Sequence, residues 1–420
     1  MSVGSHGERS RVVITGMGAV TPLGVGVAAS WEAAMAGKSG IATIKCFDPA
    51  PFSSRMAGEA TDFDPTDFID RKQVNRTARF TQFALAATSQ AMDDSGLVID
   101  ESNRDDVGVI IGSGIGGLQV TEDATHTLAE HGPRRLSPFT VPMILADIAA
   151  GEIAMRFGAT GPNFAIVSAC STGAHAIGES AAIIRRGDAV ACIAGSSEAS
   201  ITQLAVGAFC SMRALSQRND DPEHACRPFD ANRDGFVVAE ACAILILEDY
   251  EHARRRGARI LAEVAGYGAS ADAYHLVAPE PSGRGAQRAM KRAIETAGAS
   301  PDEVDYINAH GTSTQLNDAA ETLAIKAVLG ERAAKVPISS TKSMTGHSLG
   351  GAGSIESVFS VMSILDGRVP PTINYEQADP ACDLDYVTEG ARLVRPKLVL
   401  NNSFGFGGHN ACLAFREVAS

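Results

Sequence analysis

The same layout of strand, tight corner, small-residue helix and glycine stop occurs twice in this chain of 420 residues. In residues 164–187 the apolar run FAIV predicts a fully buried strand, Cys170 stands where it ends, and a helix follows that stops at Gly187. Residues 338–367 repeat this order with ISST, the corner KSMTGHSLGGAG and a helix that stops at Gly367. Strands that alternate with helices indicate an α/β protein with mixed, mainly parallel sheets. The duplication predicts five layers, in which helices enclose and separate two sheets.

The duplication also divides the chain into three parts. Residues 1–10 lack the apolar core of a signal peptide and are expected to form a disordered tail. Residues 11–255 would form an N-terminal half, with inserted helical and loop material at 119–150, and residues 256–420 a C-terminal half. Further strands are expected at 107–111, 189–194, 243–248, 260–266, 304–308, 398–402 and 411–416, and further helices at 80–95 and 285–297.

Composition and charge exclude several classes of protein. The net charge of −13 argues against general nucleic-acid binding, and no uninterrupted run of 18 apolar residues predicts a membrane-spanning helix. The eight cysteines form no CxxC pair, so neither a zinc site nor a redox pair is indicated. Most of them lie in apolar runs, which is typical of the reduced, inert cysteines of a cytoplasmic protein.

Cys170 is the first candidate for chemistry. A cysteine at a strand-to-helix corner meets the unpaired N–H groups and the positive end of the helix dipole. Both favour the thiolate, which is the nucleophilic form. On these local features alone, a small buried residue with no chemical role is an equally good interpretation.

Two histidines lie in motifs unlike their surroundings. His310 stands in NAHGTSTQLND directly after a buried strand, and His347 stands in STKSMTGHSLGGAG at the mouth of the second repeat. Glycine-bounded corners after strands lie at the carboxyl edge of a sheet, where open α/β sheets place ligand sites. Each histidine alone is more often a hydrogen-bonded structural residue.

One cysteine and two histidines allow three chemical interpretations. A papain-like protease leaves the second histidine unexplained, and a metal site would be expected to show shorter ligand spacings. Acyl transfer to a thiol uses all three side chains, because the imidazoles can donate hydrogen bonds to a carbonyl that gains negative charge.

The motifs VSACSTGAHAIG, RPFDANRDGFV, NAHGTSTQLNDAAE, SSTKSMTGHSLGGAGSIE and NNSFGFGGHN, in this order and spacing, resemble those of the β-ketoacyl-[acyl-carrier-protein] synthases. These are condensing enzymes of the thiolase superfamily, and the likeness to the type II enzymes of fatty-acid synthesis extends from about Arg11 to Glu417. The resemblance implies a thiolase-like duplicated fold, a Cys–His–His triad, a homodimer and an acyl carrier protein as partner. It implies no cofactor and no metal, because the carrier's phosphopantetheine arm brings the substrate.

The resemblance also implies a mechanism. Cys170 would take the acyl chain from the carrier, and the backbone N–H groups of Cys170 and Phe406 would form the oxyanion hole. His310 and His347 would bind the carbonyl of a malonyl thioester. Loss of CO₂ from malonate leaves an enolate, which these imidazoles would stabilise before its carbon attacks the Cys170 thioester.

Further positions match supporting residues of the family, and each has a plainer structural interpretation as well. Lys342 and Glu356 would support the triad or form a buried ion pair. Thr312 and Thr314 would bind the pantetheine arm or cap local backbone. The remaining matches are Phe404 and Phe406 at the acyl pocket, where Phe406 resembles a gate, Ile115 and Phe209 as pocket lining, and the basic residues Lys72, Arg76, Arg134, Arg135 and Arg213 as a docking face for the acidic carrier.

One segment departs from the family pattern. Residues 234–243 read DGFVVAEACA, where the family usually has glycines beside the glutamate. Ala239 and Ala241 add methyl groups at this corner, and Cys242 adds a thiol near Glu240. This departure puts the detailed loop geometry in doubt and leaves the triad intact.

Three alternatives remain at this stage. A polyketide or other specialised ketosynthase would use the same chemistry. A non-catalytic partner subunit that sets chain length usually lacks the cysteine, so Cys170 argues against it. A degradative thiolase needs a second catalytic cysteine in its C-terminal loop, and GFGGHN contains none.

Overall fold

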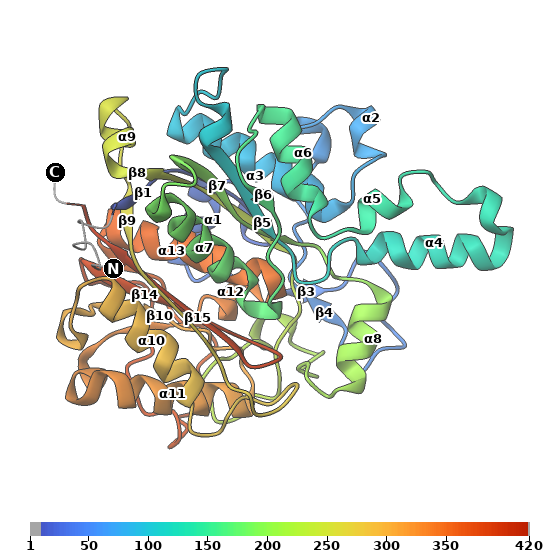
Figure 1. Cartoon of the computed structure of the whole chain (residues 1–420). Coiled ribbons are helices and arrows are strands. Elements are labelled where there is room, and N and C mark those ends of the chain that lie inside the picture. The colour runs from blue at the N-terminus through green and yellow to red at the C-terminus, as the bar shows by residue number, and fades with distance from the viewer. Residues whose placement is uncertain (1–9, 419–420) are drawn as a thin grey trace.

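The computed structural model describes residues 10–418, so the predicted tail at 1–10 lies almost wholly outside the described residues. Helices and strands alternate along both halves, as predicted (Figure 1). The strands are β1 (Val12–Thr21), β2 (Gly24–Val25), β3 (Ala42–Thr43), β4 (Met56–Ala57), β5 (Val107–Gly112), β6 (Asn163–Phe164), β7 (Ala191–Glu198), β8 (Ala241–Asp249), β9 (Ala262–Ala271), β10 (Tyr306–Asn308), β11 (Ile338–Ser339), β12 (Arg368–Val369), β13 (Arg392–Leu393), β14 (Leu398–Gly405) and β15 (His409–Arg416). The helices are α1 (Val27–Met35), α2 (Arg71–Val74), α3 (Arg79–Ser95), α4 (Leu118–His131), α5 (Thr140–Ile144), α6 (Ile148–Phe157), α7 (Thr172–Arg186), α8 (Gln203–Ser211), α9 (Tyr250–Arg255), α10 (Arg284–Thr296), α11 (Gln315–Leu329), α12 (Lys342–Thr345) and α13 (Ala352–Asp366).

The large sheet is mixed and runs through both halves in the order β11-β10-β14-β15-β9-β1-β8-β7-β5-β6, with β2 beside β1. The pairs at both ends are parallel, and those in the middle are antiparallel. The two sheets expected from the duplication are thus joined, because β1 and β9 share a short stretch of pairing in which Val13 lies opposite Glu263 and Ile14 opposite Ala262.

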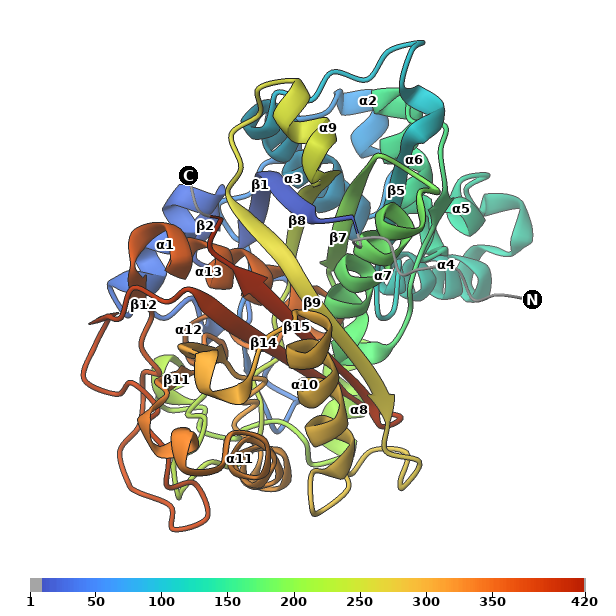
Figure 2. The ribbon, with the colours of Figure 1, turned by 60° about the vertical axis from the view of Figure 1, so that its left-hand side comes forward.

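The layers are those of an α/β fold with helices inside and outside the sheet. Helices α3 and α6 cover one outer face, and α10 covers the other with α11 beside it (Figures 1 and 2). Helices α7 and α13 lie against each other between the two parts of the sheet, and both contact strands of each half. The five layers expected from the duplicated motif are therefore present.

The repeat extends to the details of the two central corners. Ala169 and Leu349 each adopt a left-handed backbone conformation, with φ of 50° and 48°. Each begins a short 3₁₀ turn that leads into a helix of 15 residues, and each helix ends at a left-handed glycine. Cys170 and Gly350 occupy equivalent places in the two corners. Because a non-glycine residue in this region is strained, both corners are held by the surrounding structure.

The two central helices meet at Gly173 and Gly353. A Cβ built on Gly173 would lie 2.6 Å from the backbone nitrogen of Ser354, and one on Gly353 would lie 2.6 Å from that of Ala174. Real Cβ atoms do not approach backbone so closely, so the crossing of α7 and α13 requires glycine in both. This contact brings the start of α7, and with it Cys170, beside the second half.

We expect Gly173→Ala to lower the free energy of unfolding by about 1–3 kcal/mol, because the added methyl group overpacks the crossing of α7 and α13. Chemical denaturation measures this change. Gly151→Ala in α6 is a matched control, since a Cβ there meets no atom within 4 Å, and it should be neutral or stabilise by about 0.5–1 kcal/mol. Equal stability of the two variants would contradict the packing argument.

The prediction for FAIV is wrong in one respect. Only Phe164 of the run belongs to a strand, the two-residue β6, which lies at an edge of the sheet. The side chains of Phe164 and Val167 are 43% and 59% exposed. A strand at the edge of a sheet pairs with a neighbour on one side only, and its other side stays open. The apolar sequence FAIV therefore did not suffice to predict a buried strand.

Candidate active site

A cavity of about 360 Å³ brings together side chains from distant parts of the chain. Cys170, His310 and His347 all line it, as the sequence predicted. Phe404 and Phe406 form one side, and Thr312, Thr314 and Arg213 also contribute to its wall. The three candidate catalytic side chains therefore share one solvent-accessible space, although 177 positions separate Cys170 from His347 in the sequence (347 − 170).

Cys170 lies in the 3₁₀ turn Ala169–Ser171 at the start of α7, with 6% of its surface exposed. Burial raises the pKa of the Cys170 thiol to about 12, while the Lys342 ammonium and the Phe406 N–H act in the opposite direction. The sequence predicted a corner that favours thiolate. The structure instead favours the neutral thiol at rest, because removal of water from the sulfur outweighs these favourable contributions.

The loop after β14 lies directly over this corner. The backbone N–H of Phe406 donates a hydrogen bond to the Cys170 sulfur. A Cβ on Gly405 would lie 3.1 Å from the Cys170 nitrogen and 2.9 Å from the Ser168 carbonyl oxygen, so the close approach depends on glycine. The Phe406 N–H thus lies against the Cys170 sulfur, and its role in an oxyanion hole stays a prediction.

His310 follows β10 and is fixed by its backbone. Its N–H donates to Glu321 Oε1 at 2.8 Å, and its carbonyl oxygen accepts from Lys342 Nζ at 2.6 Å. Lys342 Nζ also lies 3.4 Å from His310 Nδ1. Burial, followed by the nearby Lys342 charge, holds the pKa of His310 well below 6.5. The ring is therefore neutral at physiological pH.

His347 is held by backbone pairing with the segment that departs from the family pattern. Its N–H donates to the Val237 carbonyl at 2.7 Å, and its carbonyl accepts from the Ala239 N–H at 3.0 Å. The Ala239 methyl fits because Gly58 and Gly346 face it: a Cβ on either would lie 2.9–3.0 Å from it. The extra methyl at position 239 thus leaves the position of His347 intact.

The other two departures are also accommodated. Ala241 and Cys242 begin β8 and are fully paired with β7, where Cys242 lies opposite Ser197. Glu240 forms an ion pair with Arg79 at 2.6 Å and accepts from the Ala60 N–H at 2.9 Å.

The two imidazole rings face each other nearly at right angles, with their centroids 5.4 Å apart. His347 Nδ1 is buried and has no hydrogen-bond partner among the described residues. Burial, followed by the Lys342 charge, holds the pKa of His347 well below 6.5. Two neutral rings beside one cysteine can each present an N–H donor to the oxygen of a bound substrate.

Lys342 and Glu356 form a fully buried ion pair beneath His310. Burial raises the pKa of Glu356 to about 7, although the Lys342 ammonium opposes this. The pair lies behind the triad and holds the His310 backbone through the Lys342 hydrogen bond. The structure thus contains the buried ion pair, and a role of these two residues in supporting the triad stays a prediction.

We expect Lys342→Met to destabilise the fold by about 3–5 kcal/mol near pH 8, because it leaves the Glu356 carboxylate buried without its cation. The raised pKa of Glu356 gives the sign of the pH dependence: at pH 5 the carboxyl is protonated, and the destabilisation should be smaller. Thermal melts at pH 5 and pH 8 measure it. Lys342→Met/Glu356→Leu should recover stability without recovering condensation, and a single variant as stable as wild type at pH 8 would contradict this account.

Two carboxylates that the sequence reasoning did not single out organise the loop after β10. Glu321 accepts hydrogen bonds from the His310 and Gly311 N–H groups, both at 2.8 Å. Asp318 accepts from the Thr312 N–H at 3.0 Å, and the buried Arg233 lies 3.6 Å away. Both carboxylates are at most 1% exposed. Two acidic residues three apart, which lie on one face when the segment is helical, were the signal that could have found them.

The predicted substrate-binding residues are only partly at the cavity. The Thr312 and Thr314 hydroxyls lie 3.0 Å from each other, and Thr314 also caps α11 through the Asn317 N–H. Phe209 is half-buried in the apolar cluster that contains Cys170, but it does not line the cavity. Ile115 is 39% exposed and also lies outside it. Their role as acyl-pocket lining stays a prediction.

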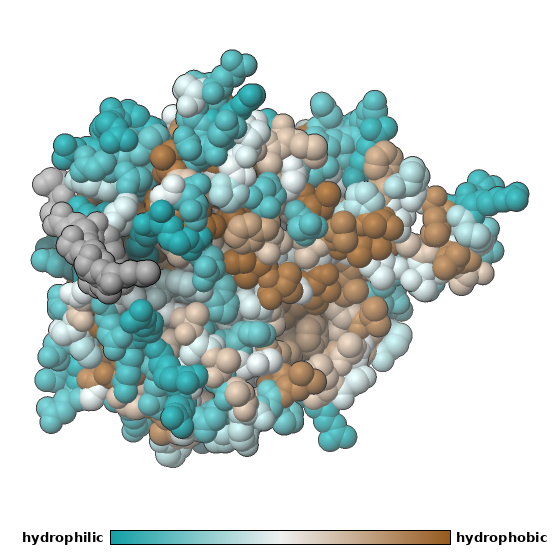
Figure 3. Space-filling view, viewed as in Figure 1, coloured by the Kyte–Doolittle hydropathy of each residue, from teal (hydrophilic) through white to brown (hydrophobic). Residues whose placement is uncertain are grey.

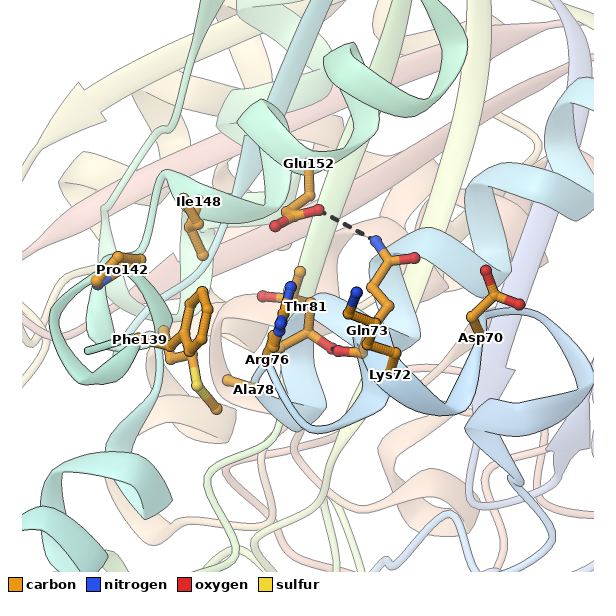
Figure 4. A pocket seen from close by; sticks show the side chains of 12 residues that line it. Asp70, Lys72, Gln73, Arg76, Ala78, Thr81, Phe139, Pro142, Ile148 and Glu152 are labelled. Carbon is orange, nitrogen blue, oxygen red and sulfur yellow. Dashed lines mark hydrogen bonds between the residues drawn. The ribbon is translucent and has the colours of Figure 1, made fainter. Parts of the chain in front are cut away.

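The predicted docking residues lie at three places. Arg213 is at the cavity wall near its mouth. Lys72 and Arg76 line a separate cavity of about 380 Å³, where the Arg76 guanidinium lies 4.8 Å from the centre of the Phe139 ring (Figure 4). Arg134 and Arg135 are exposed after α4, on the arm that projects from the body (Figure 1).

Metal and membrane sites are not found in the part of the chain that the structure describes. Residues 10–418 contain no cluster of three or more His, Cys, Asp or Glu side chains that could hold a metal ion. Their helices are too short or too polar for any to span a lipid bilayer.

Comparison with known families decides the relationship. The β-ketoacyl synthase N-terminal domain matches residues 9–253, and the C-terminal domain of the same family matches residues 261–376. The chain belongs to the β-ketoacyl synthase family. Curated β-ketoacyl synthases match almost end to end. The 3-oxoacyl-[acyl-carrier-protein] synthase 2 of Synechocystis sp. is 52% identical, that of Staphylococcus aureus 50% and that of Coxiella burnetii 48%, each over 98% of this chain and 99% of the relative.

Solved β-ketoacyl synthase structures show the same fold. A ketosynthase of a type II polyketide synthase, in complex with its acyl-carrier protein and bound to a hexaketide, is 38% identical with a TM-score of 0.91. A β-ketoacyl synthase from Burkholderia phymatum is 36% identical with a TM-score of 0.90. Each of the two alignments includes 98% of this chain and 100% of the chain of known structure. It is thus a thiolase-like condensing enzyme of the acyltransferase type.

Proposed function

We propose that this protein joins an acyl chain to a malonyl unit by decarboxylative Claisen condensation, with both substrates carried on acyl carrier protein. One observation carries the proposal: a buried cysteine and two neutral imidazoles line a single cavity, with a backbone N–H aimed at the sulfur. The arrangement supplies a nucleophile, an oxyanion donor and two donors for an enolate oxygen. The substrates bring the pantetheine arm, so no cofactor is proposed.

The first step transfers the acyl group. The Cys170 sulfur forms a bond to the carbonyl carbon of the acyl thioester, the bond from that carbon to the pantetheine sulfur breaks, and the thiol proton leaves with the carrier thiol. The negative charge on the carbonyl oxygen is stabilised by the Phe406 N–H and, by analogy with the family, by that of Cys170.

The second step extends the chain. The bond from the malonyl carbon to its carboxylate breaks and releases CO₂, and the electron pair moves onto the thioester oxygen between His310 and His347. The enolate carbon then attacks the Cys170 thioester, and the sulfur leaves and takes a proton from water. The pKa of about 12 of this buried thiol favours that protonation and restores the resting enzyme.

Fatty-acid elongation is the pathway that the similarities favour. The relatives named 3-oxoacyl-[acyl-carrier-protein] synthase 2 are 48–52% identical over nearly full length. The polyketide ketosynthase and a structure described as a ketosynthase/chain length factor are 38% and 34% identical. We therefore place polyketide synthesis second, and a non-catalytic subunit is disfavoured by Cys170 in its cavity.

A covalent adduct tests the proposed function directly. Wild-type protein incubated with an acyl-carrier thioester should gain the mass of one acyl group on the peptide that contains Cys170, and addition of malonyl carrier should discharge it as a product two carbons longer. Absence of the adduct from folded protein would overturn the proposal. A set of acyl chain lengths in the same assay would define the preferred substrate.

The carrier would dock on local positive charge, since the protein has a net charge of −13. The cations that match family docking positions are spread over the cavity mouth, the α2 cavity and the projecting arm, as described above. A neighbour of known structure is described as bound to its acyl-carrier protein, which supports the same kind of partner here. Arg213 at the cavity wall is the docking residue best placed to meet the pantetheine arm.

We also propose that the protein acts as a homodimer in the cytoplasm. The sheet ends at β6 with a free edge, and exposed edges attract further strands. Apolar side chains gather on this face between the body and the projecting arm (Figure 3). Within or next to β6 and α5, the side chains of Phe164, Val167, Val141 and Leu145 are exposed. No residue of helix α4 is fully buried in the single chain. A second copy would cover this surface.

Sedimentation tests this assembly. Val167→Asp should shift the protein from dimer to monomer, whereas Leu393→Asp, an equally exposed apolar position on β13, should leave the dimer unchanged. Monomeric wild-type protein at micromolar concentration would contradict the proposal.

A further inference from the structure

Glu198 is a buried carboxylate that the proposed reaction does not use. It is the last residue of β7 and is 0% exposed. Its Oε2 accepts hydrogen bonds from the Gly114 N–H at 2.7 Å and the Gly350 N–H at 3.2 Å. Its Oε1 accepts from the hydroxyls of Ser200 at 2.8 Å and Ser113 at 3.3 Å. One side chain thus joins three segments that are far apart in the sequence.

The two glycines show how tightly these segments are held. A Cβ on Gly114 and a Cβ on Gly350 would each lie 2.6 Å from Glu198 Oε2. The backbones of the two loops also touch each other at this point. Within the glycine-rich sequence GSGIGG, Gly114 thus makes room for the Glu198 carboxylate and for the backbone of the second half.

Both loops lead to the site. Gly350 is the counterpart of Cys170 in the second repeat, and the preceding Leu349 lines the cavity and packs in the same apolar cluster as Cys170. Gly114 precedes Ile115, which the family resemblance places at the acyl pocket. Through these hydrogen bonds the Glu198 carboxylate thus holds the two backbone segments that carry Ile115 and Leu349.

We propose that Glu198 is a positioning residue that clamps residues 113–116 to residues 348–351 and thereby sets the shape of the acyl pocket behind Cys170. This inference rests on the proposed function, because it concerns which acyl chains reach the sulfur. The clamp needs the length of glutamate and two acceptor lone pairs facing the glycines, since a backbone N–H can only donate. The serine hydroxyls can rotate and accept instead.

This geometry ranks the substitutions. In Glu198→Gln the amide oxygen can face the two glycines while the amide NH₂ donates to the serines, so the clamp is kept without the charge. Glu198→Asp keeps the charge but is one methylene too short to reach both loops, and Glu198→Ala removes the clamp. A role based on charge alone would give the opposite order for Gln and Asp.

The test measures acyl transfer to Cys170 from short, medium and long acyl carriers, as kcat/KM for each. Wild type and Glu198→Gln should share one chain-length profile, while Glu198→Asp and Glu198→Ala should flatten it, lowering the ratio between the best and worst chains at least fivefold. Glu248→Gln is the matched control. This buried carboxylate on β8 is bonded to Thr15, His252 and Arg256, and its loss should lower the melting temperature without changing the profile.

A second readout isolates the charge. Burial is the main cause of the raised pKa of Cys170, Lys342 and the Phe406 N–H lower this pKa, and the Glu198 and Glu356 carboxylates raise it further. The neutral His310 and His347 share the cavity with the sulfur. The pH dependence of Cys170 alkylation should therefore shift to lower pH in Glu198→Gln and stay near wild type in Glu198→Asp. For the profile of chain lengths the two variants should exchange places: it should stay near wild type in Glu198→Gln and change in Glu198→Asp.

The outcomes separate the two proposals. A wild-type protein that forms no acyl adduct defeats the proposed function. When the wild-type protein is acylated, two results overturn the clamp. One is a uniform fall in kcat/KM for all chain lengths in Glu198→Asp. The other is a wild-type profile of chain lengths in Glu198→Asp together with a flattened profile in Glu198→Gln. Should Glu198→Ala fail to fold, Glu198→Asp carries the test by itself, and a wild-type profile of chain lengths in that folded variant would also overturn the clamp.

Discussion

Replacing Cys170 with alanine is expected to abolish condensation, with a fall in rate on the order of 10⁵–10⁶-fold, as removal of the nucleophile causes in other acyl-transfer enzymes. No other cysteine lines the cavity. The physical reason is that the acyl group has no covalent carrier once the sulfur is gone. Mass spectrometry should find no acyl adduct, and product analysis should find no elongated chain.

The folding of the Cys170→Ala protein and its release of CO₂ serve as controls for this small substitution. Because alanine differs from cysteine by one atom and Cys170 lines the cavity, loss of the sulfur should change the melting temperature by only a few degrees. The two histidines remain in place, so release of CO₂ from malonyl carrier should continue. A folded Cys170→Ala protein that still elongates an acyl carrier would refute the assignment of the nucleophile.

The second large effect concerns the imidazoles. His310→Ala or His347→Ala should slow decarboxylation of malonyl carrier by about 10²–10³-fold, because the enolate oxygen loses one of two fixed donors. Acylation of Cys170, which precedes this step, should be affected less. Release of labelled CO₂ under single-turnover conditions measures the step, and an unchanged rate in either variant would remove that histidine from the mechanism.

The pKa values of the two histidines add a test with a definite sign. Both are held well below 6.5, so each ring stays neutral as pH falls through the range where a free histidine would gain a proton. The rate of decarboxylation should therefore show no loss with a midpoint near pH 6.5. Stability has the opposite behaviour: the unfolded chain protonates these rings below pH 6.5 and the folded chain does not, so the free energy of unfolding should decrease as pH falls below that value.

Part of this picture was visible in the amino-acid order. The twofold recurrence of strand, corner and helix predicted the layered fold, and the motifs around Cys170, His310 and His347 predicted which side chains share a site. These inferences succeed because the spacing of apolar residues, the glycines that end helices and the short motifs are all local properties of the chain. The same local reasoning missed Glu198 and Glu321, since a buried carboxylate is recognised by the N–H groups that converge on it from distant segments.

The sequence by itself determined the family, the two halves and the identities of the candidate nucleophile and enolate donors. Only the tertiary structure decided that the Cys170 thiol is neutral at rest, that FAIV lies at an open edge, and that Ala239 fits between Gly58 and Gly346. Each of these depends on how much water and which neighbouring atoms remain around a group after folding, and residues remote in the chain supply that environment.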